Sequence, residues 1–161
     1  MLGMKPISIS LSPNTERDDI SLALKVLVRP WQWNRRSETQ KLEDEFARYL
    51  GVKYAYSFNS GRSAFLAILS ALEGDPSFAK ASEGKEVLLQ AFTCNAVPNP
   101  VLWAGLKPVY VDCSPEDFNM DAEDLKKKIT GRSRAVIVQH TFGMPADIEK
   151  IAAVCREHNL F

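Results

Sequence analysis

The chain has 161 residues, enough for one domain that buries roughly 68–70% of the surface its unfolded form exposes. Its 20 Lys and Arg balance its 20 Asp and Glu, so charge gives no reason to expect a nucleic-acid partner. No stretch approaches the ~20 apolar residues of a membrane span, and residues 1–11 lack the apolar core of a signal peptide. The three cysteines lack C-x-x-C spacing, which predicts reduced thiols in a cytoplasmic protein and neither a disulfide framework nor a metal site.

Residues 1–36 are expected to form an N-terminal arm outside the main domain. Residues 19–28 have helix-like spacing, and Pro30-Trp31-Gln32-Trp33 follows them. Two tryptophans beside a proline, outside any strand–helix alternation, favour an arm that packs on another surface. A subunit partner is one candidate for that surface.

The main domain, residues 37–161, is expected to begin with a helix. Ser37-Glu38-Thr39-Gln40 has the form of a capping box. Leu42, Phe46, Tyr49 and Leu50 then fall on one helical face, and Gly51 follows where a glycine commonly ends a helix.

Strand and helix signals alternate through the rest of the chain. Strand-like runs occupy residues 52–58, 86–91, 107–112 and 134–140. Helix-like runs occupy residues 63–72 and 96–104, a short one from Asp121 to its stop at Gly131, and a last one opened by Pro145. The side chains expected to point inward from the last two helices are Leu125, Ile129, Ile148, Ile151, Ala152 and Cys155. This alternation predicts an α/β fold, a partial three-layer sandwich with helices on both faces of a mainly parallel sheet.

Two segments depart from this alternation. Residues 74–85 are rich in small and charged side chains and longer than a usual connection, which favours a surface insertion over a functional lid. Residues 159–161 follow the last helix where a further strand is due. A parallel sheet that stops there has an open edge, so we expect the sheet to continue beyond Phe161.

The run Ser60-Gly61-Arg62-Ser63-Ala64 lies between a strand-like run and an apolar helix. A helix N-terminus offers free backbone N–H groups and the positive end of the helix dipole. Glycine allows close backbone approach, and the serine hydroxyls add donors. The run therefore predicts either an anion site or only a tight connection.

Four motifs in order resemble the DegT/DnrJ/EryC1/StrS family of sugar aminotransferases. The first is the Asn59–Ala64 turn, similar to the family's S-G-T-S-A, and the second is Ala91-Phe92-Thr93-Cys94-Asn95-Ala96 followed by Asn99 and the segment 102–109. The third is Val111-Asp112 with the segment 118–121 after it, and the fourth is the segment 140–147, similar to H-x-Y-G-Q-P-A-D. The match runs from about Leu42 to the last residue, apart from the insertion.

This resemblance implies the N-terminal part of the large domain of a fold-type I enzyme that uses pyridoxal 5′-phosphate (PLP). Ser60, Gly61 and Ser63 would hold the cofactor's phosphate. Arg62 stands where the family often has threonine, and it would either pair with the phosphate or face outward.

The resemblance also implies cofactor or substrate contacts after the later strands. Cys94 stands where the family commonly has an aromatic residue that stacks on the pyridine ring. Phe92 would either cover that ring instead or belong to the core. His140 would either line the site or be a structural histidine bonded to a loop carbonyl.

The family's aspartate for the pyridine nitrogen, its Schiff-base lysine and its small C-terminal domain are all expected beyond Phe161. This chain alone is therefore expected to be inactive. The whole protein would move an amino group from an amino acid, glutamate being expected, to a keto-sugar nucleotide, as a homodimer in the cytoplasm. The alternatives are a PLP-dependent sugar dehydratase on the same scaffold and a non-catalytic binding or dimerisation module.

Overall fold

The computed structural model describes residues 15–33, 35–74 and 84–161. The chain divides into two compact units, Met1–Ser57 and Phe58–Phe161. The predicted division into an N-terminal arm, residues 1–36, and a main domain, residues 37–161, stays a prediction. Most of the predicted insertion, residues 75–83, lies outside the described residues.

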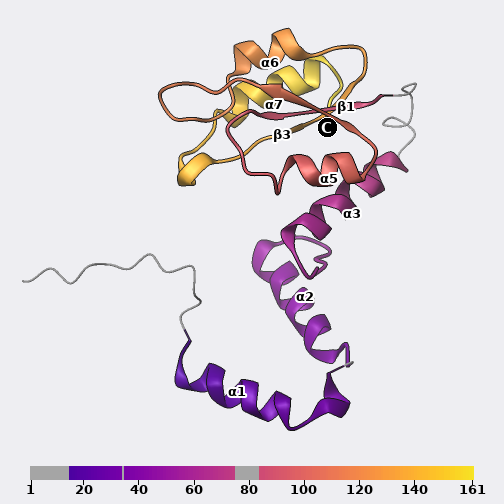
Figure 1. Cartoon of the computed structure of the whole chain (residues 1–161), viewed down its shortest axis with the longest axis vertical. Helices are drawn as coiled ribbons and strands as arrows, with labels where there is room; N and C mark the ends of the chain where they lie inside the picture. Colours follow the sequence, from indigo (N-terminus) through magenta and orange to yellow (C-terminus); the bar gives the residue numbers. More distant parts are fainter. Residues whose placement is uncertain (1–14, 34, 75–83) are drawn as a thin grey trace, which may run out of the picture. The chain divides into compact units, whose positions relative to one another are not determined.

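The first unit consists of the helices α1 (Arg17–Leu27), η1 (Pro30–Gln32) and α2 (Ser37–Leu50) (Figure 1). The Trp33 indole N–H donates to the carbonyl oxygen of Val26 at 2.7 Å, which ties η1 to α1. Gly51 ends α2 in the left-handed conformation with φ 68°, as its position predicts. The predicted capping box is wrong, because Ser37 already lies inside the helix and Arg36 precedes it without a side-chain cap.

The apolar face predicted on α2 exists as a pattern but is not covered. Leu42, Phe46 and Tyr49 are 57%, 52% and 84% exposed, and neither α1 nor α2 has a buried residue. Both helices therefore present apolar side chains at their surface.

The strand predicted over residues 52–58 is wrong, since this segment has no strand partner in the described structure. Its polar groups bond locally instead: the Glu43 carboxylate accepts hydrogen bonds from the Ser57 backbone N–H and hydroxyl at 2.8 and 2.9 Å. A β-prone run forms a strand only where a neighbouring strand takes its backbone hydrogen bonds.

The second unit contains a parallel sheet of β1 (Glu86–Gln90), β2 (Lys107–Val111) and β3 (Ser133–Ile137). The strand order is β2-β1-β3, with Leu88 paired to Val109 on one side and Val136 on the other. Three of the four predicted strands are thus confirmed, with slightly shorter bounds. Helices separate them along the chain, so the α/β prediction is confirmed.

Helices cover both faces of this sheet (Figure 1). α3 (Gly61–Glu73) and α5 (Pro98–Trp103) pack on one face, while α6 (Ala122–Lys128) and α7 (Ile148–Glu157) pack on the other. One core joins Leu69, Val87, Leu89, Val101, Leu106 and Ala135; the other joins Leu88, Val111, Met120, Leu125, Ile151 and Val154. β1 is the central strand, because it pairs with β2 on one side and β3 on the other, and its side chains enter the two cores alternately.

The helix starts follow their capping residues. Asp121 caps α6 by accepting a hydrogen bond from the Glu123 N–H, as its position predicts. The predicted start of α7 at Pro145 is wrong, because Asp147 caps the helix and α7 begins at Ile148. The prediction that Ile148 points inward is wrong, because it is 45% exposed, whereas Ile151 is buried as predicted.

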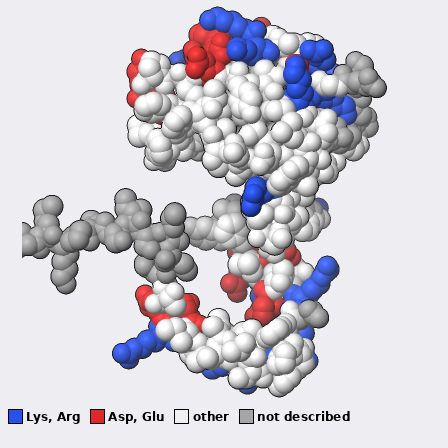
Figure 2. Space-filling view, viewed as in Figure 1, with Lys and Arg blue, Asp and Glu red and all other residues white. Residues whose placement is uncertain are grey.

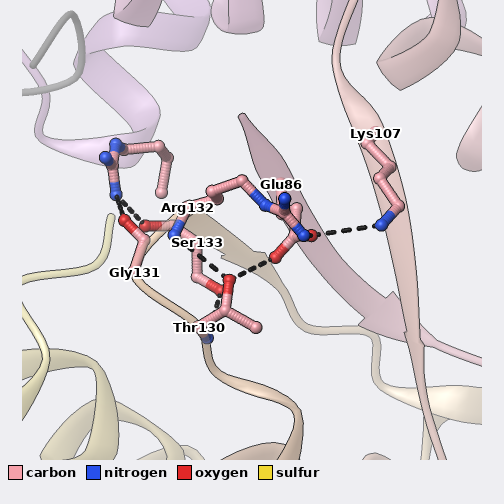
Figure 3. Close-up of polar contacts among 7 residues, drawn as sticks. Glu86, Lys107, Thr130, Gly131, Arg132 and Ser133 are labelled. Atoms are coloured by element: carbon pink, nitrogen blue, oxygen red, sulfur yellow. Dashed lines mark hydrogen bonds and ion pairs between the residues drawn. The ribbon is translucent and has the colours of Figure 1, made fainter. Parts of the chain in front are cut away.

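The amino end of β1 carries a buried carboxylate, Glu86, which binds groups from both neighbouring strand regions (Figure 3). Its Oε1 lies 3.2 Å from Lys107 Nζ and 3.1 Å from Arg132 Nη2. Its Oε2 accepts a 2.6 Å hydrogen bond from the Thr130 hydroxyl. Burial raises the pKa of Glu86, but the hydrogen bonds from Thr130 and Lys107 and the charge of Arg132 outweigh it and hold that pKa below its usual value.

At the free side of β3, the last residue makes strand-like contacts. The Phe161 N–H donates to the Arg134 carbonyl at 3.0 Å, and the Phe161 carbonyl accepts from the Val136 N–H at 2.9 Å. Phe161 therefore pairs through its backbone with β3.

Within the described ranges, no helix is long and apolar enough to cross a membrane, and no group of three or more His, Cys, Asp or Glu could hold a metal ion. Figure 2 shows charged side chains of the second unit gathered along the top and right of the view, with a broad uncharged area beside them.

Candidate functional site

A cleft of about 520 Å³ lies where β1 and β3 end. Parallel strands bring their carboxyl ends to one edge of the sheet, which is where open α/β folds bind ligands. The cleft is lined by Gln90, Ala91, Phe92, Thr93, Cys94, Gln139, His140, Thr141 and Phe142. None of these side chains is acidic, and none is lysine or arginine.

Gln90, which is 1% exposed, joins three separate segments at this edge. Its Nε2 donates to the Phe92 carbonyl at 2.9 Å and the Thr141 hydroxyl at 2.8 Å, and lies 3.5 Å from the Phe118 carbonyl. A reversed amide would place Oε1 against two carbonyl oxygens, so this network fixes the amide's orientation. Gln90 therefore holds the loops after β1, β2 and β3 together.

Asn119, which is 2% exposed, forms a second connection between the loops. Its Oδ1 accepts from the Thr141 N–H at 2.9 Å, and its Nδ2 donates to the Met144 carbonyl at 3.2 Å and to Asp117 Oδ2 at 3.0 Å. The backbone and side-chain hydrogen bonds from Asn119 hold the pKa of Asp117 below its usual value.

Three phenylalanines meet at the cleft. The Phe92 ring centroid lies 5.4 Å from that of Phe118 and 5.9 Å from that of Phe142, the latter pair at 62°. Phe118 and Phe142 have left-handed backbone conformations, with φ 60° and 53°. Phe92 is half-exposed and lies in the cleft, where it was predicted to contact either a ring or the core.

His140 lines the cleft and also supports a loop. Its Nδ1 accepts a 3.0 Å hydrogen bond from the Ala146 N–H. A backbone N–H can only donate, so the neutral ring carries its hydrogen on Nε2. The structural alternative predicted for His140, a hydrogen bond to a loop carbonyl, therefore differs from the structure, in which His140 accepts from a loop N–H.

The predicted anion-binding turn forms the start of α3. Ser60 caps the helix, since its Oγ accepts from the Ser63 N–H at 3.1 Å and lies 3.0 Å from Ser63 Oγ. A Cβ built on Gly61 would have no atom within 4 Å outside its immediate surroundings in the helix, so the backbone there is open to approach. Arg62 is exposed, and none of these residues lines the cleft described above.

Several buried polar atoms at the cleft have no hydrogen-bond partner. In the part of the chain that the structure describes, four buried side-chain atoms are in this position, and three belong to cleft residues: Gln90 Oε1, Thr93 Oγ1 and Gln139 Oε1. Buried polar atoms are normally paired, so these three unpartnered atoms are unusual.

The family motifs include Asn119, Thr141 and Phe142 but give them no role, and sequence reasoning did not single out Gln90 or Gln139. A glutamine at the end of the apolar run Val-Leu-Leu is an unusual residue for a buried strand, and this was the available signal for Gln90. No described lysine lines the cleft; Lys107 is ion-paired at the opposite end of β1, and Lys126 pairs with Glu123 on α6.

The cleft thus lies at the edge of the sheet where open α/β proteins commonly bind ligands. The model of the DegT/DnrJ/EryC1/StrS aminotransferase family matches residues 13–161, so the chain belongs to this family.

Two curated relatives represent different reactions. The chain is 37% identical to dTDP-4-dehydro-2,6-dideoxy-D-glucose 3-dehydratase of Saccharopolyspora spinosa over 123 residues. These residues make up 76% of this chain and 27% of that protein. It is 32% identical to GDP-perosamine synthase of Caulobacter vibrioides over 160 residues. These residues make up 99% of this chain and 41% of that protein. The chain therefore spans less than half the length of these relatives.

Solved structures share the fold. An aminotransferase from Psychrobacter cryohalolentis matches with a TM-score of 0.79 and 26% identity, over 94% of this chain and 37% of that one. A GDP-4-keto-6-deoxy-D-mannose-3-dehydratase of E. coli with bound hydrated PLP matches with a TM-score of 0.76 and 23% identity, over 92% of this chain and 38% of that one. The predicted family and fold class are both confirmed.

Proposed function

We propose that this chain is the N-terminal part of the large domain of a PLP-dependent aminotransferase. The whole protein moves an amino group from an amino acid, glutamate in our proposal, to a keto-sugar nucleotide. It works as a homodimer in the cytoplasm, with the Schiff-base lysine beyond Phe161. The observation that carries this proposal is the uncharged cleft at the carboxyl edge of a family sheet, with three unpartnered polar atoms among its residues.

The residues present fit a cofactor with a ring and a phosphate. Phe92 and Cys94 line the cleft and offer apolar contact to a ring. The N-terminus of α3 offers backbone N–H groups and the Ser63 hydroxyl to the phosphate. When bound, PLP supplies the electron sink that transamination needs.

In this arrangement the neutral imidazole of His140 carries its hydrogen on Nε2, because its Nδ1 accepts the hydrogen bond from the Ala146 N–H. This bond also orients the ring. His140 can donate a hydrogen bond to a ligand oxygen in the cleft. The Gln90 and Asn119 networks keep the cleft-lining loops in place while ligands enter and leave.

A dehydratase on the same scaffold is the second candidate. The 37% identity to a sugar 3-dehydratase favours it. In our proposal the aminotransferase has the Schiff-base lysine, and the dehydratase has a different residue at that position. This position lies outside the 161 residues of the chain. A non-catalytic binding or dimerisation module is the third candidate.

The test uses the full-length gene product with PLP, glutamate and keto-sugar nucleotides. An aminated sugar nucleotide in the product, identified by mass spectrometry, supports the aminotransferase. A deoxygenated sugar without a new amine supports the dehydratase, and no conversion with any keto-sugar tested supports the binding module.

The phosphate role of the α3 N-terminus is tested separately by Gly61→Val. Because a Cβ added at Gly61 has no atom within 4 Å outside its immediate surroundings in the helix, the variant is expected to fold normally but to obstruct a ligand at the turn. PLP affinity, measured by absorbance titration, should fall at least about tenfold, or ~1.4 kcal/mol.

Gly131→Val is the matched control, since Gly131 is equally open and lies in the loop before β3 at the amino end of the sheet. It should leave PLP affinity unchanged. If both variants and the wild type bind PLP with equal affinity, Gly61 and its neighbours do not form the phosphate site.

A further inference from the structure

Asn119 is a buried amide whose own position is fixed by the loop after β2. Its backbone N–H donates to Asp117 Oδ1 at 3.0 Å, and its backbone carbonyl accepts from the Ser114 N–H at 2.9 Å. The next residue, Met120, forms an antiparallel bridge with Cys113. Because the residue is 2% exposed and its backbone is bonded on both sides, its side-chain amide is held in one place before any partner is considered.

This amide holds the loop after β3 at two points. Its Oδ1 accepts from the Thr141 N–H at 2.9 Å, and its Nδ2 donates to the Met144 carbonyl at 3.2 Å. Thr141 directly follows His140, and Met144 lies two residues before Ala146. The two held points therefore adjoin both partners of one further bond, in which the Ala146 N–H donates to His140 Nδ1 at 3.0 Å.

The loop between these points has an unfavourable backbone. Phe142 and Gly143 have positive φ values of 53° and 82°. The left-handed conformation costs free energy at a phenylalanine, and it persists where the surrounding structure holds it. Gln90 also holds Thr141, through the threonine hydroxyl at 2.8 Å. Of these two buried amides, only Asn119 also reaches the far side of the loop, at Met144.

The consequence for His140 is an oriented ring with one defined donor. Since Nδ1 accepts from a backbone N–H, the neutral ring carries its hydrogen on Nε2. Among the residues that the structure describes, none bonds to Nε2, and His140 lines the cleft at the carboxyl edge of the sheet. Its Nε2–H can therefore donate to an oxygen atom on a ring bound there.

We propose that Asn119 is a positioning residue of the candidate site. It holds the loop at Thr141 and Met144 and so orients the ring of His140, whose Nε2–H donates to an oxygen on the cofactor's ring. The inference rests on the proposed function, because that function places the PLP ring in this cleft. Asn119 does not itself line the cleft, so it acts on the cofactor through His140.

The experiment uses variants of the full-length gene product. Asn119→Ala removes both bonds to the loop. Asn119→Ser takes its place if the alanine variant does not fold, because the serine hydroxyl can hold a water at the Thr141 N–H. Glu86→Gln is the control, since it removes ion pairs at the opposite end of β1 and leaves the loop unchanged.

The first measurement is nitrogen NMR of isotope-labelled histidine, without PLP, at about pH 8, where an ordinary imidazole is neutral. His140→Ala assigns the signal. In the wild type and in Glu86→Gln, His140 should carry its hydrogen on Nε2 alone. In Asn119→Ala both tautomers should be populated, because the Ala146 N–H no longer stays at Nδ1. An unchanged His140 signal in Asn119→Ala overturns the proposal, and so does an equal change in Glu86→Gln.

The second measurement is a double-mutant cycle in PLP affinity, determined by absorbance titration. Asn119→Ala should weaken PLP binding by about three- to tenfold, as expected for the loss of one hydrogen bond. In the His140→Ala background the same substitution should cost less than about twofold, because the route through the imidazole is already gone. An equal loss in both backgrounds overturns the proposal, since Asn119 would then act on the cofactor without His140.

Failure of the proposed function and failure of this inference have different signatures. A wild-type protein that binds no PLP refutes the proposed function, and the cofactor contact of His140 with it. A wild type that binds PLP, beside an Asn119→Ala variant with the same affinity, refutes only the positioning role. The ring signals need no cofactor, so they report the link from Asn119 to His140 in either case.

Discussion

Glu86 connects the amino ends of the three strands through one buried carboxylate (Figure 3). We predict that Glu86→Gln lowers the free energy of unfolding by about 1–3 kcal/mol, because the amide keeps the shape but loses both ion pairs. Urea unfolding at pH 7 measures the change. Glu123→Gln is the control, since its pair with Lys126 is exposed and should contribute at most about 0.5 kcal/mol.

The same carboxylate makes stability depend on pH. The folded pKa of Glu86 lies below its unfolded value, so its contribution is fully present above about pH 4.5 and is lost as pH falls through the folded pKa. The stability difference between wild type and Glu86→Gln should therefore shrink as the pH is lowered below that value. A constant difference down to the acid unfolding transition would contradict the ion-pair explanation.

Some residues whose roles depend on near neighbours were predictable, although the capping box at Ser37 and the helix start at Pro145 were not, and those with distant partners were not predicted. The cap at Asp121 and the glycine stop at Gly51 follow from local sequence. Gln90 and Asn119 act through Thr141, which is 51 and 22 residues away, and no local pattern reports that. The family motifs placed Phe92, Cys94 and His140 at the cleft, but they did not predict the hydrogen bonds that hold it.

At the scale of elements, the first unit leaves the apolar side of α2 uncovered, with Leu42, Phe46 and Tyr49 all more than half exposed. We predict that the 161-residue chain associates through this face. Replacing Leu42 and Phe46 together by Lys should reduce both sedimentation-measured association and binding of a hydrophobic dye. Glu38→Lys on α2, which breaks only an exposed pair with Lys41, is the control. A wild-type chain that sediments as a monomer without binding dye would refute this.

Element types were predicted well where burial supports them. The runs over β1, β2 and β3 became strands because each has a parallel neighbour and helices on its faces. Residues 52–58 have equal β-propensity and no such neighbour in the described structure, so they form none. Propensity alone could not distinguish these cases.

For the molecule as a whole, we predict that the 161-residue chain neither transaminates nor forms a covalent adduct with PLP. No described lysine lines the cleft, and a lysine needs placement at the aldehyde and partial deprotonation to react. Absorbance before and after borohydride reduction, followed by peptide mapping, gives the answer. A stoichiometric adduct at one lysine would show that a reactive amine already lies in this chain.

The alternation of β1 also limits how this protein can change over evolutionary time. Glu86, Leu88 and Gln90 share one side of the strand, and Val87 and Leu89 share the other. Inserting or deleting one residue would exchange these sides and bring two polar side chains against the α3–α5 core, away from every partner they have. The length of this five-residue strand is therefore constrained, even where one apolar side chain can replace another. We expect homologues to differ there by substitution and never by insertion or deletion.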